Sequence, residues 1–204
     1  LRVKYDLGLF DDPYGKVERS SQVGSEKNRQ VARDAVKMSM VLLKNESSAL
    51  PLNKDQKITV VGSGANNLGM QNGGWTVEWQ GRSTPDFKIL DSDKNEELSF
   101  SEVTTYFKSA YDSKYDAGNV EGFFKNLDKD SDKVVSMEEF TAFATESPFQ
   151  PSGTSILNAL EGASNSQDLV TYDPRAENIS KGDVIVAVVG ENPYAEGIGD
   201  NPTI

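Results

Sequence analysis

The chain has 204 residues with a formal net charge of -11, and it contains neither cysteine nor histidine. Disulfides, thiolate zinc sites and histidine-based catalytic triads are therefore excluded, so proton transfer and metal binding must rest on carboxylates. The acid excess repels a phosphate backbone, which argues against a nucleic-acid partner. No apolar run approaches the roughly 20 residues that a membrane-spanning helix needs, so no membrane partner is expected.

The first part of the chain predicts a linker followed by a helix. Residues 1–24 are rich in Gly, Asp and Pro and show no sustained period, which indicates an interdomain linker. A helix of about four turns is predicted next, because Ser25 can cap it and apolar side chains recur at helical spacing from Val31 to Val36. The apolar stretch 41–46 is a candidate short strand.

Two apolar runs, Ile58–Val61 and 183–189, are typical of buried parallel strands that end at glycine-containing loops. Between them, residues 152–163 predict a helix with Thr154 as its cap. Strands that alternate with helices predict an α/β fold, with an open, mostly parallel sheet sandwiched by helices.

In such folds, ligands bind beyond the carboxyl ends of the strands, which points to the loops 62–79 and 190–200. Gly62 and Gly64 open the first loop and suggest a dinucleotide site. Asn67 stands where the third glycine of that motif is required, so nucleotide binding is disfavoured.

Residues 82–152, here called the insert, interrupt this pattern with 15 Asp and Glu against 8 Lys and Arg. Two segments within the insert, LDSDKNEELSFSEV and LDKDSDKVVSMEEF, repeat 37 positions apart. Each places oxygen-bearing groups at the positions of a 12-residue EF-hand loop, which suits the six to eight oxygens that Ca²⁺ prefers. The repeat therefore predicts a small all-helical, EF-hand-like insert that binds Ca²⁺.

The expected ligands of the first acidic loop (91–102) are Asp91, Asp93, Asn95, Glu97, Ser99 and Glu102. Those of the second acidic loop (128–139) are Asp128, Asp130, Asp132, Val134, Ser136 and Glu139. Leu98 and Val135 are expected to pair as the short strand between the loops. Glu96 and Lys133 stand where the sharp turn normally requires glycine, so both are expected at positive φ, with weakened affinity. The alternative is an acidic solvated linker, for which two matched copies would have to arise by accident.

The apolar side chains of the insert predict amphipathic helices around these loops. The residues expected to form its core are Phe87, Leu90, Val103, Phe107, Phe123, Phe124, Leu127, Phe140 and Phe143.

Outside the insert, the motifs LGLFDDPYG, ARDAVKMSMVLLKNE, VVGSGANNLGMQNGGWTVEWQG and VVGENPYAEGIGDNPTI follow one another in order. Together they resemble glycoside hydrolase family 3, close to exo-β-glucanases and β-glucosidases, over residues 1–81 and 153–204. Several motifs in a fixed order are far more specific than any one alone. The resemblance implies that residues 25–81 and 153–204 form the second, α/β sandwich domain of such an enzyme, in truncated form.

The resemblance also implies a catalytic arrangement. Family members place an aspartate nucleophile on a preceding (β/α)8 barrel and the acid/base glutamate on the second domain. Carried onto this sequence, the acid/base is Glu196, and the aromatic wall of a sugar subsite is Trp79. Trp75, like Trp79, can stack on the apolar face of a pyranose ring and is a second candidate for substrate binding. The glycosidase chemistry needs no cofactor. The expected partners are a β-glucan or β-glucoside and the barrel of the same enzyme, so the chain alone is expected to be inactive.

Several alternatives stay open at this point. Glu191 is the nearest rival of Glu196, although its place directly after a strand favours structural hydrogen bonds. Trp75 and Trp79 could instead pack in the core. A noncatalytic, calcium-dependent interaction module on the same scaffold is the rival function. Weak calcium loops fill at the roughly 10⁻⁴ to 10⁻³ M found outside cells, which suits a periplasmic or secreted enzyme.

Overall fold

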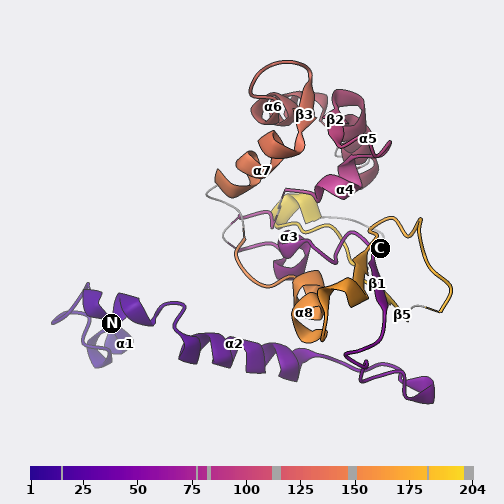
Figure 1. The fold of residues 1–204 in the computed structure, drawn as a ribbon. Helices are drawn as coiled ribbons and strands as arrows, with labels where there is room; N and C mark the ends of the chain where they lie inside the picture. Colours follow the sequence, from indigo (N-terminus) through magenta and orange to yellow (C-terminus); the bar gives the residue numbers. More distant parts are fainter. Residues whose placement is uncertain are drawn as a thin grey trace. The chain divides into compact units, whose positions relative to one another are not determined.

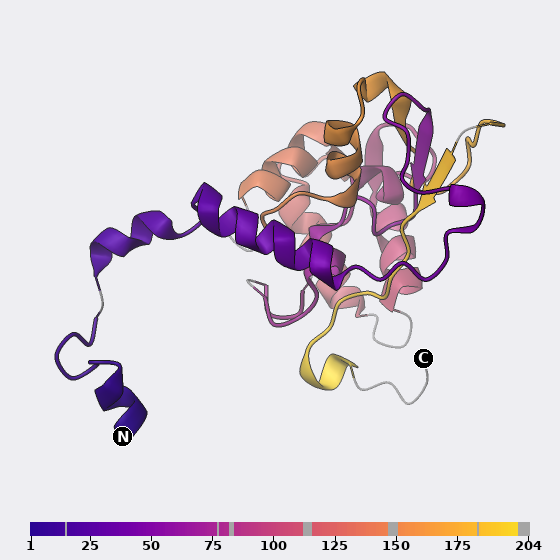
Figure 2. The same cartoon turned by 90° about the horizontal axis from the view of Figure 1, so that it is seen from below.

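The computed structural model describes residues 1–14, 16–76, 78–81, 84–111, 116–146, 151–182 and 184–199. The chain divides into two compact units, Leu1–Pro51 and Leu52–Ile204, and each is described by itself. Figure 1 and Figure 2 trace their elements from two directions. Among the described residues, no helix combines the length and the apolar character needed to cross a membrane.

The N-terminal unit consists of short helices that bury no side chain. Its elements are α1 (Arg2–Asp6), η1 (Val17–Gln22), α2 (Glu26–Ser39) and η2 (Glu46–Ser48). The predicted cap of α2 is confirmed, because the Asn28 N–H donates to Ser25 Oγ at 3.4 Å.

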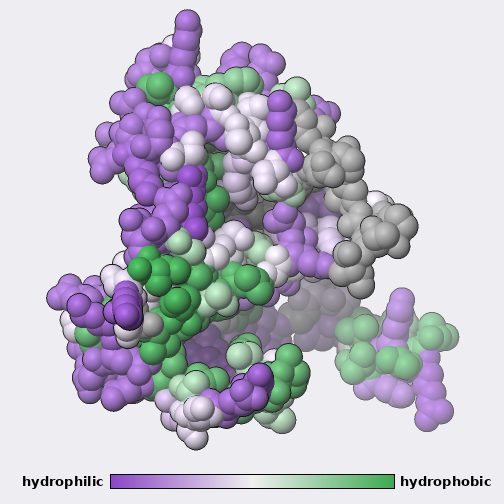
Figure 3. Space-filling model, turned by 90° about the vertical axis from the view of Figure 1, so that its right-hand side faces the viewer, coloured by the Kyte–Doolittle hydropathy of each residue, from purple (hydrophilic) through white to green (hydrophobic). Residues whose placement is uncertain are grey.

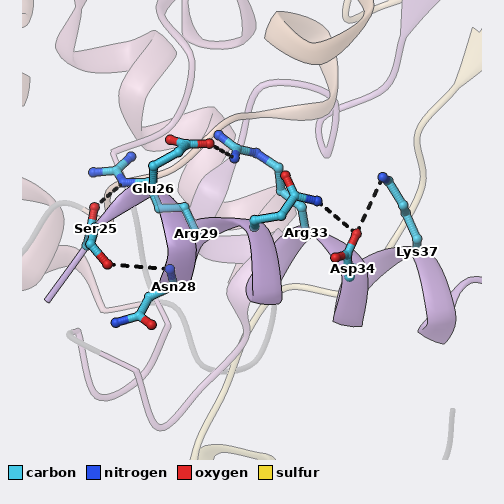
Figure 4. Close-up of polar contacts among 9 residues, drawn as sticks. Ser25, Glu26, Asn28, Arg29, Arg33, Asp34 and Lys37 are labelled. Atoms are coloured by element: carbon cyan, nitrogen blue, oxygen red, sulfur yellow. Dashed lines mark hydrogen bonds and ion pairs between the residues drawn. The ribbon is translucent and has the colours of Figure 1, made fainter. Parts of the chain in front are cut away.

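Exposed polar contacts line α2, as Figure 4 shows. Arg33 pairs with Glu26 at 2.7 Å, and Lys37 approaches Asp34 at 3.6 Å. Exposed pairs of this kind stabilise a helix by only about 0.2–1 kcal/mol each. The helix therefore depends mainly on its cap and its intrinsic propensity.

Two expectations for this unit differ from the structure. Residues 40–45 form no strand, and Leu43 is 92% exposed. A strand needs a neighbouring strand to satisfy its backbone groups, and this segment pairs with none of the described residues. The short helix α1 also lies inside the expected linker.

The second unit contains a three-stranded parallel sheet in the order β4-β1-β5. Its strands are β4 (Val170–Tyr172), β1 (Ile58–Val61) and β5 (Val184–Ala187). In this register Ile58 of β1 lies opposite both Val170 and Val184. The parallel sheet and its helices confirm the predicted α/β class, although β4 was not foreseen.

Helix α8 (Ile156–Ala163) packs on one face of the sheet. Leu157 is 5% exposed and belongs to the same core cluster as Ile58 and Val60. Ser155, and not Thr154, caps this helix, because Asn158 N donates to Ser155 Oγ at 3.1 Å. The side chain at the cap position accepts this bond, and Thr154 lies one residue too early.

The other face of the sheet is partly open. Ile185 of β5 points to this face and is 47% exposed. Figure 3 shows apolar surface on the side of the molecule that carries β5 in Figure 1. The remaining short elements of this sheet body, meaning the second unit without the insert, are α3 (Leu68–Asn72), η4 (Gln167–Leu169) and η5 (Glu196–Gly199).

The insert has its own core. Its elements are α4 (Phe87–Leu90), β2 (Glu97–Ser99), α5 (Phe100–Tyr111), α6 (Ala117–Leu127), β3 (Val134–Ser136) and α7 (Met137–Glu146). The expected pairing of Leu98 with Val135 is confirmed in the antiparallel pair β2–β3, so the insert is not purely helical. All nine apolar residues expected in its core are buried there or packed against it. The insert and the sheet body lie in one compact unit, so the domain limits at 82 and 152 stay a prediction.

Candidate functional site

Residues 73–81, here called the tryptophan hairpin, follow α3 and present two indoles. The Trp75 N–H donates to the Trp79 carbonyl at 2.8 Å and closes the turn. The two rings meet nearly edge to face, with centroids 6.2 Å apart. Trp75 is 67% exposed and Trp79 48% exposed, which does not match the alternative of core packing.

Residues 188–196, here called the Glu196 loop, follow β5. Glu196 has an exposed side chain and a left-handed backbone, with φ of 52°. Trp75 shares this unusual conformation, with φ of 60°. The left-handed region costs a non-glycine residue about 1–2 kcal/mol. Such strain gathers at functional sites, where the surrounding structure holds it in place.

The tryptophan hairpin and the Glu196 loop are packed backbone to backbone. A side chain at Gly74 would collide with the carbonyl oxygen of Tyr194. A Cβ on Gly81 would lie 2.7 Å from the Cβ of Pro193, and Gly81 also has a positive φ of 73°. Only glycine permits so close an approach at both positions.

These two loops also lie at the predicted edge of the sheet. The segment that leaves the carboxyl end of β1 leads through α3 to the tryptophan hairpin, and the Glu196 loop leaves the carboxyl end of β5, the parallel neighbour of β1. Residues 200–204, which end the second predicted loop and its motif, lie outside the described residues. Glu191 is exposed too, and within the described ranges its side chain makes no hydrogen bond, contrary to the structural role expected for it.

The first acidic loop gathers its predicted ligands. Oxygens of Asp91, Asp93 and Glu102 lie within 4.8 Å of one another. Asn95 joins them through its side-chain N–H, which donates to Asp93 Oδ2 at 3.2 Å. The Glu97 N–H donates to Asn95 Oδ1, and Ser99 Oγ donates to Glu102 Oε2.

The second acidic loop repeats this arrangement. Asp128, Asp130 and Glu139 place their oxygens within 4.8 Å of one another. The remaining predicted ligands are linked to these three along the loop: the Asp132 N–H donates to Asp130, the Val134 N–H to Asp132, and Ser136 Oγ to Glu139. Asp128 Oδ1 is buried and has no hydrogen-bond partner among the described residues.

Both acidic loops contain the strain expected from their sequence. Glu96 and Lys133 adopt φ of 67° and 79°, so the prediction for the position normally held by glycine is confirmed. Lys94 and Ser131, two residues earlier in each loop, are also left-handed. The loops therefore keep the expected curvature with residues that are poorly suited to it.

Hydrogen bonds keep the closing glutamates ionised. Burial alone would raise the pKa of Glu102, but N–H and O–H groups of Ser99 and Ser92 donate to its carboxylate and lower the pKa to about 2. The Ser136 N–H lowers the pKa of Glu139 in the same way. Both groups are thus carboxylates at neutral pH, the form that a hard cation requires.

Several polar contacts join the insert to the sheet body. Arg175, beyond β4, donates to the Ile89 carbonyl at 2.6 Å and to the Ser92 carbonyl at 3.4 Å. Lys94 of the first acidic loop forms an ion pair with Glu177 at 2.5 Å. A further contact reaches the Glu196 loop, where Asn192 donates to the Ala110 carbonyl at the end of α5 at 2.7 Å. No local pattern in the sequence indicates these contacts, because the partners lie more than 80 positions apart.

The chain is similar to glycosidases of known sequence. It is 35% identical over 85 residues to a lysosomal β-glucosidase of Dictyostelium discoideum, covering 40% of this chain and 10% of that protein. It is 42% identical over 83 residues to a periplasmic β-glucosidase of Salmonella typhimurium, covering 38% of this chain and 11% of that protein. The chain thus spans only about a tenth of these curated relatives.

Solved structures and a family model extend the likeness over most of the chain. The exo-1,3/1,4-β-glucanase ExoP of a Pseudoalteromonas species superimposes with a TM-score of 0.56 and 27% identity, covering 95% of this chain and 17% of that one. The model of the glycosyl hydrolase family 3 C-terminal domain matches residues 40–204. The chain therefore belongs to the glycosyl hydrolase family 3 C-terminal domain family.

Proposed function

We propose that this chain is the part of a retaining exo-acting β-glucosidase or β-glucan glucohydrolase that supplies the acid/base Glu196 and an aromatic wall of Trp79 and Trp75. The observation that carries this proposal is the left-handed Glu196, exposed on a loop that packs against the tryptophan hairpin. The indole faces can stack on the apolar face of a pyranose ring.

The proposed chemistry needs a second carboxylate from a barrel domain. In a retaining enzyme the two carboxyl groups lie about 5–5.5 Å apart. The barrel aspartate attacks the anomeric carbon while Glu196 donates a proton to the leaving oxygen. Glu196, now ionised, then takes a proton from the water that releases the sugar. Without the barrel the chain is expected to hydrolyse no aryl β-glucoside.

The substitution Glu196→Gln, made in the enzyme that joins this chain to its barrel, tests the role. The kcat/KM of glucosides with poor leaving groups, which reports glycosylation and not the common release of the sugar, should fall by roughly 10²–10⁴-fold, because these groups need protonation. Dinitrophenolate leaves without a proton, so the rate for dinitrophenyl glucoside should fall far less. Glu191→Gln is the matched control and should leave both rates close to wild type. Equal losses for both substrates in Glu196→Gln would contradict the proposal.

The insert is proposed to be an EF-hand-like pair that binds Ca²⁺ in preference to Mg²⁺. Two clusters of three carboxylates support this, together with the buried, unpartnered Asp128 Oδ1. Twelve-residue loops offer the flexible oxygen cage that suits Ca²⁺, whereas Mg²⁺ demands a smaller octahedral one. Weak sites of this kind, together with a glucan substrate, favour a periplasmic or secreted enzyme.

Calorimetric titration tests the calcium proposal. Wild-type chain should release or absorb heat with calcium in the range of roughly 10⁻⁴–10⁻³ M, and the double variant Glu102→Gln, Glu139→Gln should not. Unchanged binding in the double variant would refute the assignment of ligands.

A noncatalytic calcium-dependent module is the rival function. It predicts calcium binding with no loss of hydrolysis in Glu196→Gln, so the two experiments separate the alternatives.

A further inference from the structure

We infer that Gln80 is a positioning residue, which holds the backbone of the Glu196 loop and so sets the direction of the Glu196 side chain for the proposed proton transfer. This inference rests on the proposed acid/base role of Glu196. Gln80 belongs to the tryptophan hairpin, yet its side chain reaches the other loop. Its Oε1 accepts a hydrogen bond from the Ala195 N–H at 2.9 Å.

This hydrogen bond is buried, so its loss would leave the Ala195 N–H without a partner. Gln80 is 4% exposed and Ala195 is 2% exposed, so water does not replace the bond when it is lost. A buried backbone N–H without a partner is strongly disfavoured, which ties Ala195 to the hairpin. The bond comes one residue before Glu196, where the backbone turns into its left-handed conformation.

The side chain of Glu196 cannot fix its own direction. It is exposed, and its carboxylate makes no hydrogen bond within the described ranges. Its aim is therefore set by the backbone. Residues 193–195, directly before it, are held by Gln80 and by the close approaches of Gly74 and Gly81. Of these three contacts, only the one from Gln80 is a side-chain hydrogen bond that can be removed without adding a clash.

The side-chain nitrogen of Gln80 takes no part in this hydrogen bond. Its Nε2 is buried and has no hydrogen-bond partner among the described residues. The positioning role needs only the oxygen, because Oε1 alone accepts from Ala195. This separation allows the acceptor and the donor to be tested with different variants. Gln80→Met removes both, whereas Gln80→Glu keeps an oxygen acceptor of the same shape.

Hydrogen exchange of the 204-residue chain tests, without any substrate, whether Gln80 holds the Ala195 amide. Exchange of the Ala195 amide should quicken at least about tenfold in Gln80→Met, because a broken hydrogen bond exposes the amide to local opening. It should stay slow in Gln80→Glu and in the matched control Gln167→Met, which alters an exposed glutamine. Wild-type protection in Gln80→Met, or lost protection in Gln80→Glu, would overturn the inference.

Kinetics of the barrel-containing enzyme test the functional part. Gln80→Met should lower kcat/KM for a poor leaving group by roughly a hundredfold, since an acid displaced by about 1 Å loses most of its effect. Dinitrophenyl glucoside should lose less than about threefold, and Gln80→Glu should recover most of the difference. Equal losses for both substrates would reduce Gln80 to a packing residue and overturn the inference.

Glu196→Ala, measured beside these variants, separates the role of Gln80 from the role of Glu196. Equal losses for both leaving groups in Glu196→Ala would refute the proposed acid/base role itself. A leaving-group dependence in Glu196→Ala that Gln80→Met does not share would refute the role of Gln80 alone.

Discussion

The insert and the sheet body bury their apolar side chains in different ways. The insert encloses nine buried apolar residues from its own helices and strands, with edge-to-face rings such as Phe87 and Phe140 at 5.3 Å. The sheet body has a smaller cluster around Ile58 and Val60, and Ile185 on its other face is 47% exposed. The insert therefore buries the larger apolar cluster of the two, whereas the loops of the sheet body carry the proposed chemistry.

The largest expected effect comes from the core of the insert. Leu98→Ala removes a fully buried side chain and should lower the free energy of unfolding of the insert by about 2–5 kcal/mol. Ile185→Ala in the sheet body should cost less than about 1 kcal/mol, because that side chain is already half exposed. Chemical denaturation with hydrogen exchange measures both. A similar cost at the two sites would remove the contrast between the two bodies.

Calcium should sharpen the same contrast. At about a hundredfold excess over Kd, it should stabilise the folded insert by about 2.7 kcal/mol, if the unfolded chain binds none. Hydrogen exchange should slow at Leu98 and stay unchanged at Val60, and magnesium serves as the control ion. Equal protection at both amides would mean that the insert and the sheet body unfold together.

Substitution of Arg175 should weaken the contact between the insert and the sheet body. Arg175→Met keeps much of the aliphatic stem and removes the donors to the Ile89 and Ser92 carbonyls, which should cost about 1–2 kcal/mol. The first acidic loop should then bind calcium less tightly, and the second should be unaffected. Titration followed by the amide signals of each loop measures this, with Arg33→Met on the exposed face of α2 as the control. Equal weakening of both loops would contradict it.

The smallest effect concerns backbone strain in the insert. Glu96→Gly should stabilise the first acidic loop by up to about 1 kcal/mol, because glycine adopts φ of 67° without a clash. Glu97→Gly, one residue further in β2, should instead destabilise it by about 0.5–1 kcal/mol. Thermal unfolding of the two variants gives the signs. A stabilising Glu97→Gly would show that charge, and not conformation, governs the loop.

Local patterns in the sequence predicted much of this structure. The cap of α2 at Ser25, the strand β1, the pairing of Leu98 with Val135 and the core of the insert all follow from spacing and side-chain type. These features depend on neighbours within one helix, one strand or one repeat. Short stretches of chain are therefore enough to predict them.

The features that sequence patterns predicted wrongly or not at all depend on contacts between distant residues. The apolar segment 41–46 has strand-like composition, but it finds no partner strand in the described part of the chain. Strand β4 has only three residues, too few to give a pattern, and it forms by pairing with β1. Gln80 and Arg175 act on residues 115 and 83–86 positions away, which no local pattern reveals.

The position of α5 has a consequence for how such an enzyme can evolve. Its first turn holds Glu102, which closes the first acidic loop, and its last turn holds Ala110, which accepts from Asn192 four residues before Glu196. A helix of 12 residues is a stiff rod about 18 Å long. A change at Glu102, a proposed calcium ligand at one end, thus has a short mechanical route to the Glu196 loop at the other. If the proposed calcium binding and the proposed activity both hold, substitutions in the first acidic loop could alter turnover without changing Glu196 or the two tryptophans.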